Sequence, residues 1–301
     1  MAVTAAQFAL FLEPKLSNVW HDAFEAEPSK FDKVFNIRDM NKNTITDAEM
    51  AGFGALQPQA DGAEVVFDDP IAPRELSYTY IVRALGYQVH ERMRINDLYG
   101  EIDRLERDLA DSAKDDAEAS AWSVLTNGFG TTNTGFDGLQ LFSTAHTRLD
   151  GGSNQSNRPA TDEALSLSAL HNSIITMKKW VNHRGRPRVH NPKQLIIPSD
   201  LIITADELLD STLKPGTANN DINVVTKFGI QPMEVEYLND SSATAWFLIA
   251  DKHDLNWFWR FRPQTGMEVE FKTETILRKV RQAYAFGFGK WEGCYGTDGV
   301  A

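Results

Sequence analysis

The most regular hydrophobic pattern of the chain begins at Ile95. From there to position 125, apolar residues recur three and four positions apart before alanines replace them. This spacing predicts one amphipathic helix over residues 95–126, about 48 Å long at ~1.5 Å per residue. A coiled coil is the weaker alternative, because the heptad pattern lasts barely two repeats. We expect the charged residues of this helix to form a solvated outer face. They are Asp103, Arg104, Glu106, Arg107, Asp108, Asp111, Lys114, Asp115, Asp116 and Glu118.

Strand patterns lie on both sides of this helix. Residues 65–67 and 78–82 are β-rich and are separated by a segment with two prolines, which predicts a hairpin with a long tip. Residues 255–262 and 267–272 alternate in polarity, as half-buried strands do. A last strand carries apolar residues on one parity, and we expect that face of an antiparallel sheet to pack on the long helix. These residues are Ile276, Val280, Tyr284, Phe286 and Phe288.

The middle of the chain follows a different pattern. Repeated glycines make residues 127–160 a loop-rich segment. A helix is predicted to begin near Thr161, followed by a buried strand at 194–198, a helix at 199–210 and another strand at 230–238. The predicted apolar face of the first of these helices consists of Leu167, Leu170, Ile174, Met177 and Val181. Alternating helices and strands indicate an α/β module.

Residues 1–60 follow no sustained period, and three prolines interrupt them. They predict an extended arm with short helices. Its apolar residues exceed what such a segment can cover by itself, so we expect it to lie on the body of the chain or on a neighbouring subunit, although an ordinary N-terminal subdomain is an equal alternative. Strands at the end of the chain are expected to pack on a helix from its middle. The fold is therefore α+β, with residues 161–240 inserted into a discontinuous domain.

Composition narrows the possible functions. The 301 residues include 30 Lys and Arg and 42 Asp and Glu, which gives a net charge of −12. A chain with this charge repels phosphate backbones, which argues against a dedicated DNA-binding protein. The one cysteine, Cys294, cannot form an intrachain disulfide. No apolar run is long enough to cross a bilayer, and no secretion signal is indicated.

Catalytic signatures are weak, and no catalytic, metal or cofactor site is predicted. Gly289 and Lys290 lack the remaining residues of a phosphate-binding loop. Ser143 and His146 are close in sequence but lack the turn that presents a nucleophilic serine. The seven histidines show no metal-ligand spacing. The only basic patch is a turn that we interpret as solvated or as a subunit salt bridge rather than a phosphate site. It contains Arg184, Arg186 and Arg188.

Several segments resemble one family in order and spacing. They are Asp137-Gly138-Leu139-Gln140-Leu141-Phe142-Ser143-Thr144-Ala145-His146, Gly151-Gly152-Ser153-Asn154, Leu195-Ile196-Ile197-Pro198, Ala205-Asp206-Glu207-Leu208-Leu209-Asp210-Ser211, Pro215-Gly216-Thr217-Ala218-Asn219-Asn220-Asp221-Ile222-Asn223, Tyr237-Leu238 and Ala245-Trp246-Phe247-Leu248. Together they resemble the major capsid proteins of tailed bacteriophages, in the Mu-like major head subunit group. The resemblance extends over residues 60–301 and is weakest in the arm.

This resemblance implies a Hong Kong 97 type capsid fold. Residues 1–60 would be the N-terminal arm, 61–94 the E-loop hairpin, 95–160 with 241–301 the P-domain built on its spine helix, and 161–240 the A-domain. The implied function is structural rather than enzymatic. Copies would assemble in the bacterial host cytoplasm as hexamers and pentamers, and these would form the icosahedral shell of the virion.

The resemblance also implies partners. The shell would enclose double-stranded DNA without sequence-specific binding, and we expect a portal and decoration proteins. Sixty mixed residues cannot hold the long helical scaffolding segment of some relatives, so a separate scaffolding protein is expected, or such a segment has been removed. The alternatives are an encapsulin-like nanocompartment shell and, more remotely, a hydrolase that uses Ser143 and His146.

Lysine usage departs from some capsids of this fold, which join subunits by an isopeptide bond from a hairpin lysine to an asparagine of a neighbour. Residues 61–90 contain no lysine, and the nearest are Lys42 and Lys114. The arginines of the hairpin, Arg74 and Arg83, keep their protons and cannot attack a carbonyl group. We therefore expect the hairpin to hold its neighbour without covalent bonds.

Overall fold

The computed structural model describes residues 5–62, 64–69, 71–90, 92–93, 100–214, 221–270 and 272–299. The chain forms two compact units. The first contains Met1–Ile45, Tyr78–Ala121 and Trp257–Phe286, and the second contains Thr46–Ser77, Trp122–Asn256 and Gly287–Ala301. Each unit contains helices and a sheet, which confirms the α+β class. In the described ranges, no helix is long and apolar enough to cross a membrane.

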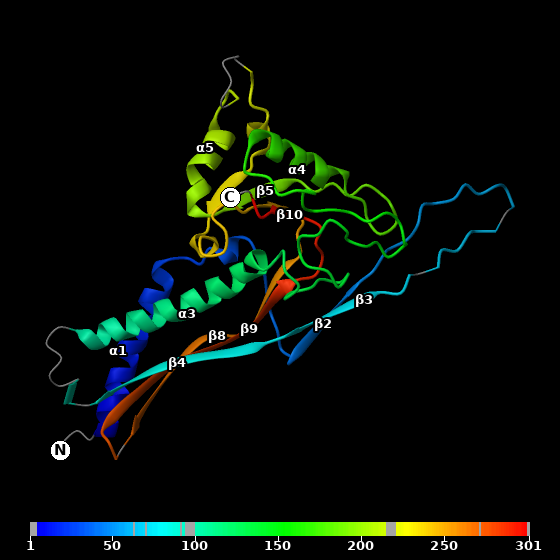
Figure 1. Cartoon of the computed structure of the whole chain (residues 1–301). Coiled ribbons are helices and arrows are strands. Elements are labelled where there is room, and N and C mark those ends of the chain that lie inside the picture. The colour runs from blue at the N-terminus through cyan, green and yellow to red at the C-terminus, as the bar shows by residue number, and fades with distance from the viewer. Residues whose placement is uncertain are drawn as a thin grey trace. The chain divides into compact units, whose positions relative to one another are not determined.

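The first unit is built on a four-stranded sheet. Its strand order is β1 (Asn36–Asp39), β8 (Leu255–Glu270), β9 (Thr275–Phe288) and β4 (Ile81–His90). Helix α3 (Glu101–Thr126) runs along one face of this sheet (Figure 1). The predicted antiparallel sheet against a long helix is therefore confirmed. The first residues of the predicted helix, 95–99, lie outside the described residues.

Packing between α3 and the sheet follows the predicted parity of β9. Val280 and Tyr284 are buried, and the Tyr284 hydroxyl lies 2.9 Å from the Ser120 hydroxyl of α3. Gln282, on the same parity, donates from Nε2 to the Ala113 carbonyl at 2.9 Å. Residues on one parity of a strand share one face, so apolar and polar side chains of β9 both reach the helix.

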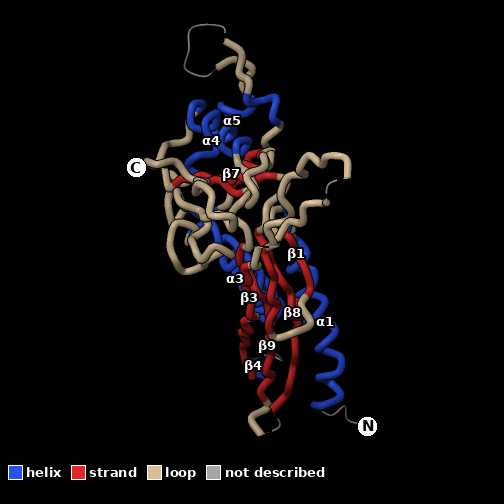
Figure 2. The backbone as a smooth tube through the Cα atoms, turned by 90° about the vertical axis from the view of Figure 1, so that its right-hand side faces the viewer, coloured by secondary structure: helices blue, strands red, loops and turns tan. Residues whose placement is uncertain are grey.

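The N-terminal segment departs from the predicted short helices, because α1 (Ala5–Ala26) is 22 residues long and includes Pro14. Figure 2 shows α1 beside the sheet. Leu16 and Trp20, one helical turn apart, are both 1% exposed. Burial of these two side chains offsets the free energy that the helix loses because a proline cannot donate a backbone hydrogen bond. The core around Trp20 contains Leu109, Ala110, Ala113 and Val280.

The second unit contains another four-stranded sheet. Its order is β10 (Cys294–Thr297), β7 (Trp246–Ala250), β5 (Pro192–Ile197) and β6 (Gln231–Glu234). β5 is parallel to β6 and antiparallel to β7, and β10 is antiparallel to β7. The predicted strand at 194–198 is confirmed as β5. The predicted strand at 230–238 is shorter, because a 3-10 turn at Glu236–Leu238 follows β6.

Two helices of the second unit lie before and after β5 in the sequence. Helix α5 (Ile202–Asp210) follows a 3-10 turn at Ser199–Leu201, as predicted. Helix α4 (Leu167–Lys179) begins six residues later than Thr161. Its N-cap is Ser166, whose hydroxyl accepts the Ala169 N–H. Two further 3-10 turns are Phe31–Lys33 and Val225–Phe228.

The compact units divide the chain differently from the predicted domains. Strands β7 and β10 lie in the range 241–301 that we assigned to the P-domain, but they pair in the sheet of β5 and β6. The loop segment 127–160 also belongs to the second unit. The predicted domains and the compact units therefore differ in where they place residues 127–160 and the two strands β7 and β10.

The predicted hairpin is displaced along the chain. Residues 65–67 form no strand, and the partner of β3 (Arg74–Thr79) is β2 (Thr44–Glu49). Cross-strand hydroxyl pairs support this register, because Thr46 lies 3.0 Å from Ser77 and Thr44 lies 3.3 Å from Thr79. The hairpin tip is therefore longer than predicted and covers residues 50–73.

Candidate functional site

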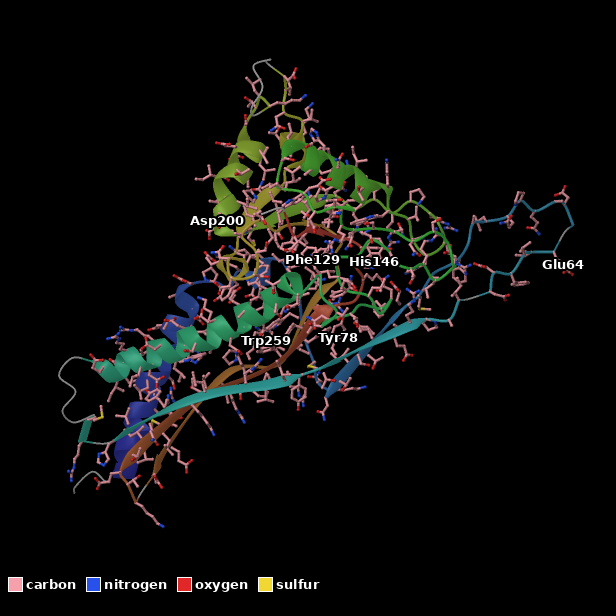
Figure 3. All side chains as sticks on the ribbon, viewed as in Figure 1. Glu64, Tyr78, Phe129, His146, Asp200 and Trp259 are labelled. Atoms are coloured by element: carbon pink, nitrogen blue, oxygen red, sulfur yellow. The ribbon has the colours of Figure 1, made fainter. Side chains whose placement is uncertain are left out.

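The segment between β2 and β3, residues 50–73, is called the hairpin loop below. Large apolar side chains of this loop are exposed to solvent. They are Met50 at 73%, Phe53 at 77%, Leu56 at 100%, Val65 at 61%, Val66 at 70% and Phe67 at 90%. Glu64 marks the far end of the loop (Figure 3). Grouped exposure of this kind marks an interaction surface rather than a solvated loop.

Both strands of the hairpin are anchored where the loop begins and ends. At the end of β2, the Glu49 carboxylate lies 3.0 Å from His183 Nε2 and 3.8 Å from Lys290 Nζ. At the start of β3, the Arg74 guanidinium donates to the carbonyl and the hydroxyl of Thr147, at 3.1 and 3.0 Å. Glu49 is 5% exposed. The loop therefore extends from a fixed base.

The basic turn also contacts the hairpin loop. Arg184 donates to the carbonyls of Gly52 and Asp69, and its guanidinium lies 3.3 Å from the Asp68 carboxylate. Arg186 and Arg188 are exposed on the same turn. Of the two interpretations preferred from sequence, a solvated turn is wrong for Arg184, which forms its ion pair within the chain.

The segment that begins at Asp137 forms a buried polar network in the second unit. His146 is fully buried, with Nδ1 2.6 Å from an Asp137 carboxylate oxygen and Nε2 3.0 Å from Asn157 Oδ1 (Figure 3). The Asn157 amide donates to the carbonyls of Leu141 and Cys294 at 2.6 and 3.0 Å. The imidazole stacks on Trp291 with ring centroids 4.5 Å apart. These contacts join the loop segment to the C-terminal strand.

Hydrogen bonds in this network determine the orientation of the Asn157 amide and lower the pKa of Asp137. Because Asn157 Nδ2 donates twice, its Oδ1 must be the acceptor for His146 Nε2–H. Burial by itself would raise the pKa of Asp137, but the hydrogen bond and the charge of His146 hold that pKa below its usual value. The Asp137 carboxylate is therefore ionised at neutral pH and accepts a hydrogen bond from the imidazole ring.

Ser143 and His146 do not form a catalytic pair. The Ser143 hydroxyl accepts the Ala145 N–H at 3.2 Å, whereas both imidazole nitrogens bond to Asp137 and Asn157. Neither ring nitrogen can act as a general base toward Ser143 in this arrangement. The geometry therefore removes the basis of the hydrolase alternative.

A buried ion pair on α3 corrects the predicted solvated face. Glu106 and Arg278 have side chains that are 0% exposed, and Arg278 Nε donates to Glu106 Oε1 at 2.8 Å. The Tyr87 hydroxyl donates to the same oxygen at 2.5 Å. Glu118 is also buried, and its carboxylate accepts the Lys30 N–H. The parity of Arg278 with Ile276 and Val280 on β9 was the available sequence signal for this pair.

Other candidate chemistry finds little support in the described ranges. No group of three His, Cys, Asp or Glu residues there could hold a metal ion. The Lys290 N–H donates to the Asp254 carboxylate at 3.0 Å, so this amide is engaged within the protein. Cys294 is buried, and desolvation raises the pKa of its thiol. These groups support packing rather than catalysis.

Comparison with known proteins identifies the family. Residues 75–296 match the family model described as phage capsid protein. The chain belongs to this family. A search of curated proteins gives no match. As a phage capsid protein, the chain is a component of the virion.

Solved structures agree on the fold of this capsid protein. The chain is similar to a structure titled Microbacterium phage Oxtober96, with TM-score 0.58 and 11% identity over 90% of this chain and 91% of that chain. The bacteriophage JBD30 capsid gives TM-score 0.58 and 15% identity over 71% and 92%. A virus-like particle from Pyrococcus furiosus gives 0.55 and 10% over 94% and 98%. The predicted Hong Kong 97 type fold is confirmed.

Proposed function

We propose that this phage capsid protein is the major head subunit of a tailed phage and belongs to the Mu-like group. Its copies would form hexamers and pentamers that close into an icosahedral shell around double-stranded DNA. The observation that carries this proposal is the exposed apolar hairpin loop on a chain of the capsid family. A second copy would cover this surface, because closed symmetric assemblies bury repeated apolar patches.

We propose domain roles that rest on strand pairing. We assign the E-loop to β2, β3 and the hairpin loop, and the spine of the P-domain to α3. The sheet of β5, β6, β7 and β10, with α4 and α5, corresponds to the A-domain. Helix α1 belongs to the N-terminal arm. This assignment moves β7 and β10 from the predicted P-domain to the A-domain, because they pair with β5.

Edge strand β4 supports assembly as well. It is the last strand of its sheet, and it exposes Ile81, Val82 and Leu85 at 38, 57 and 53%. An apolar edge strand in a soluble protein invites pairing with another chain. The first unit thus offers a surface of its own to a neighbouring subunit.

The partners of the shell follow from charge and composition. A net charge of −12, repeated in every copy, gives a wall that encloses DNA without binding its sequence. We propose a separate scaffolding protein, a portal and decoration proteins as further partners. The role is structural rather than enzymatic, and the engaged ring nitrogens of His146 support this.

Electron microscopy of the purified protein tests the proposal. We expect closed icosahedral particles, and particles from infected cells should contain double-stranded DNA. Phe67→Asp should reduce particle yield at least about ten-fold while leaving the fold intact, because this side chain is 90% exposed. The matched control is Gln57→Ala, a polar position of the same loop, which should assemble normally.

Two results would contradict the proposal. A protein that stays monomeric at high concentration would exclude a shell. Particles from native cells that hold an enzyme instead of DNA would favour the nanocompartment alternative.

A further inference from the structure

We propose that Arg184 is a positioning residue for assembly, which holds the two limbs of the hairpin loop together before a neighbouring subunit binds. This inference rests on the proposed function. The residues involved form what we call the Arg184 cluster. They are Gly52 and Gly54 on one limb, Asp68 and Asp69 on the other, and Arg184 between them.

The contacts of the cluster reach both limbs from one guanidinium. Arg184 Nε donates to the Gly52 carbonyl at 3.2 Å. Its Nη2 donates to the Asp69 carbonyl at 3.0 Å and lies 3.3 Å from Asp68 Oδ2. That carboxylate oxygen also accepts the Gly54 N–H at 2.5 Å. The planar fork of arginine can serve separated acceptors at once, whereas a lysine ammonium is a single point of charge.

Arg184 is itself held by a turn that does not depend on the loop. The Asn182 side-chain oxygen accepts the N–H groups of Arg184 and Arg186 at 3.0 and 2.9 Å. Asn182 and Arg186 also bond through their backbones, and Gly185 has the left-handed φ of 73° that this turn requires. The Arg184 side chain is only 16% exposed. A rigid turn therefore presents a partly desolvated cation to the loop.

The loop has features that match this cation. Gly52 has φ +69°, a conformation that disfavours other residues. Residues 50–73 carry four acidic residues, Asp61, Glu64, Asp68 and Asp69, and no lysine or arginine. The described residues of this loop form no strand, so ladder hydrogen bonds do not join its limbs. The Arg184 cluster supplies a link between them.

A link of this kind matters for association. Ordering a flexible segment at an interface costs free energy, and ordering it beforehand lowers that cost. The cluster fixes both limbs next to the base, while Leu56, Val65 and Phe67 remain exposed beyond it. Loss of Arg184 should therefore slow assembly without unfolding the subunit.

The experiment compares Arg184→Ala with Arg186→Ala and Arg188→Ala, the two exposed arginines of the same turn. The first measurement is amide hydrogen exchange of peptides from residues 50–73 in unassembled protein. Arg184→Ala should increase exchange about ten-fold or more, as expected for hydrogen bonds to a charged group. Both controls should stay within about two-fold of the wild type, because exposed side chains contribute little. The second measurement is the assembly rate by light scattering, which should fall only for Arg184→Ala.

Further variants separate positioning from simple destabilisation. Asp68→Ala removes the acceptor from the loop side and should give the same loosening and the same slow assembly. Arg184→Lys should recover part of the assembly rate, and the double change Arg184→Asp with Asp68→Arg should recover more than either single change.

The proposal is overturned if Arg184→Ala leaves loop exchange unchanged, or if the loop loosens while the assembly rate is unchanged. If the wild-type protein forms no shell at all, the proposed function fails. The exchange measurement on unassembled protein still decides whether the cluster orders the loop.

Discussion

The buried pair of Glu106 and Arg278 allows a quantitative test of the packing of α3 on its sheet. Arg278→Met would remove the cation and leave the Glu106 carboxylate buried with the Tyr87 hydroxyl as its remaining donor among the contacts described. Burial and the bond to Glu106 raise the pKa of Tyr87, so this hydroxyl stays protonated and continues to donate. One neutral donor cannot replace the charge of the guanidinium.

The expected loss of stability is large. Breaking one partner of a buried ion pair costs about 3–5 kcal/mol, because an uncompensated charge remains in a medium of low dielectric constant. A whole domain is stable by roughly 5–15 kcal/mol, so this one change removes a substantial part. The matched control is Lys15 with Asp103, whose side chains are 61 and 28% exposed. Lys15→Met should cost no more than about 1 kcal/mol, because water screens exposed pairs.

Urea denaturation of unassembled protein, followed by tryptophan fluorescence, measures both losses. Trp20 is a suitable reporter, since it lies in the core between α1, α3 and β9. The double change Glu106→Leu with Arg278→Met should be more stable than Arg278→Met, because apolar pairs of similar volume replace buried ion pairs at little cost. A loss below about 1 kcal/mol for Arg278→Met would refute the reasoning, since it would mean that water reaches Glu106.

Two further predictions concern other parts of the molecule. The pKa of Asp137 is lowered in the folded state, so its contribution to stability is present above its ordinary value of 3.8 and is lost as the pH falls through the lower folded value. Asp137→Asn removes the charged acceptor of a buried hydrogen bond, so it should cost about 1.5–3 kcal/mol at pH 7 and reduce the loss of stability on acidification. Urea titrations at pH 7, 5 and 3 would show both effects. Mature particles boiled in detergent should run as one band near the chain mass of 33.7 kDa, because residues 43–113 contain no lysine. A ladder of covalent multimers would contradict the second expectation, and an acid dependence of Asp137→Asn equal to that of the wild type would contradict the first.

The sequence predicted the parts of the fold that depend on local periodicity. The spacing of Leu105 and Leu109 indicated α3, and the parity of Val280 and Tyr284 indicated the face of β9 that meets it. A strong period over many residues leaves few other structures that bury the same side chains.

Elements that depend on the ion-pair partner of a charged residue were predicted less well. Glu106 was assigned to a solvated face because nothing near it in sequence shows that Arg278 enters the same core. The start of α4 was placed too early because Asp162 suits a helix N-terminus, yet its carboxylate accepts from Arg158 at 2.8 Å instead. In both cases the position of the acidic residue in its own segment does not show which basic residue it contacts.

The sequence predicted that the candidate site is a hairpin, but not which strands form it. The sequence predicted a hairpin with a long tip, and the structure shows exposed apolar side chains in that tip. It did not indicate that Thr44–Glu49 pairs with Arg74–Thr79, because the first of these runs carries only one large aliphatic residue, Ile45. Hydroxyl pairs and the base contacts of Glu49 set this register instead.

The error at residues 65–67 has a physical meaning of its own. Val65, Val66 and Phe67 have high strand propensity, yet they form no strand in their own chain and are 61 to 90% exposed. Strand propensity reflects a side chain that fits a pleated, half-buried surface, and a single subunit offers these residues no such surface. The proposed shell would supply it through a neighbouring subunit, for which main-chain pairing gives affinity and alternate side chains give register. The strand pattern of these residues is thus wrong for the isolated subunit and fits the proposed shell. The same side chains must be exposed to solvent before association and buried after it.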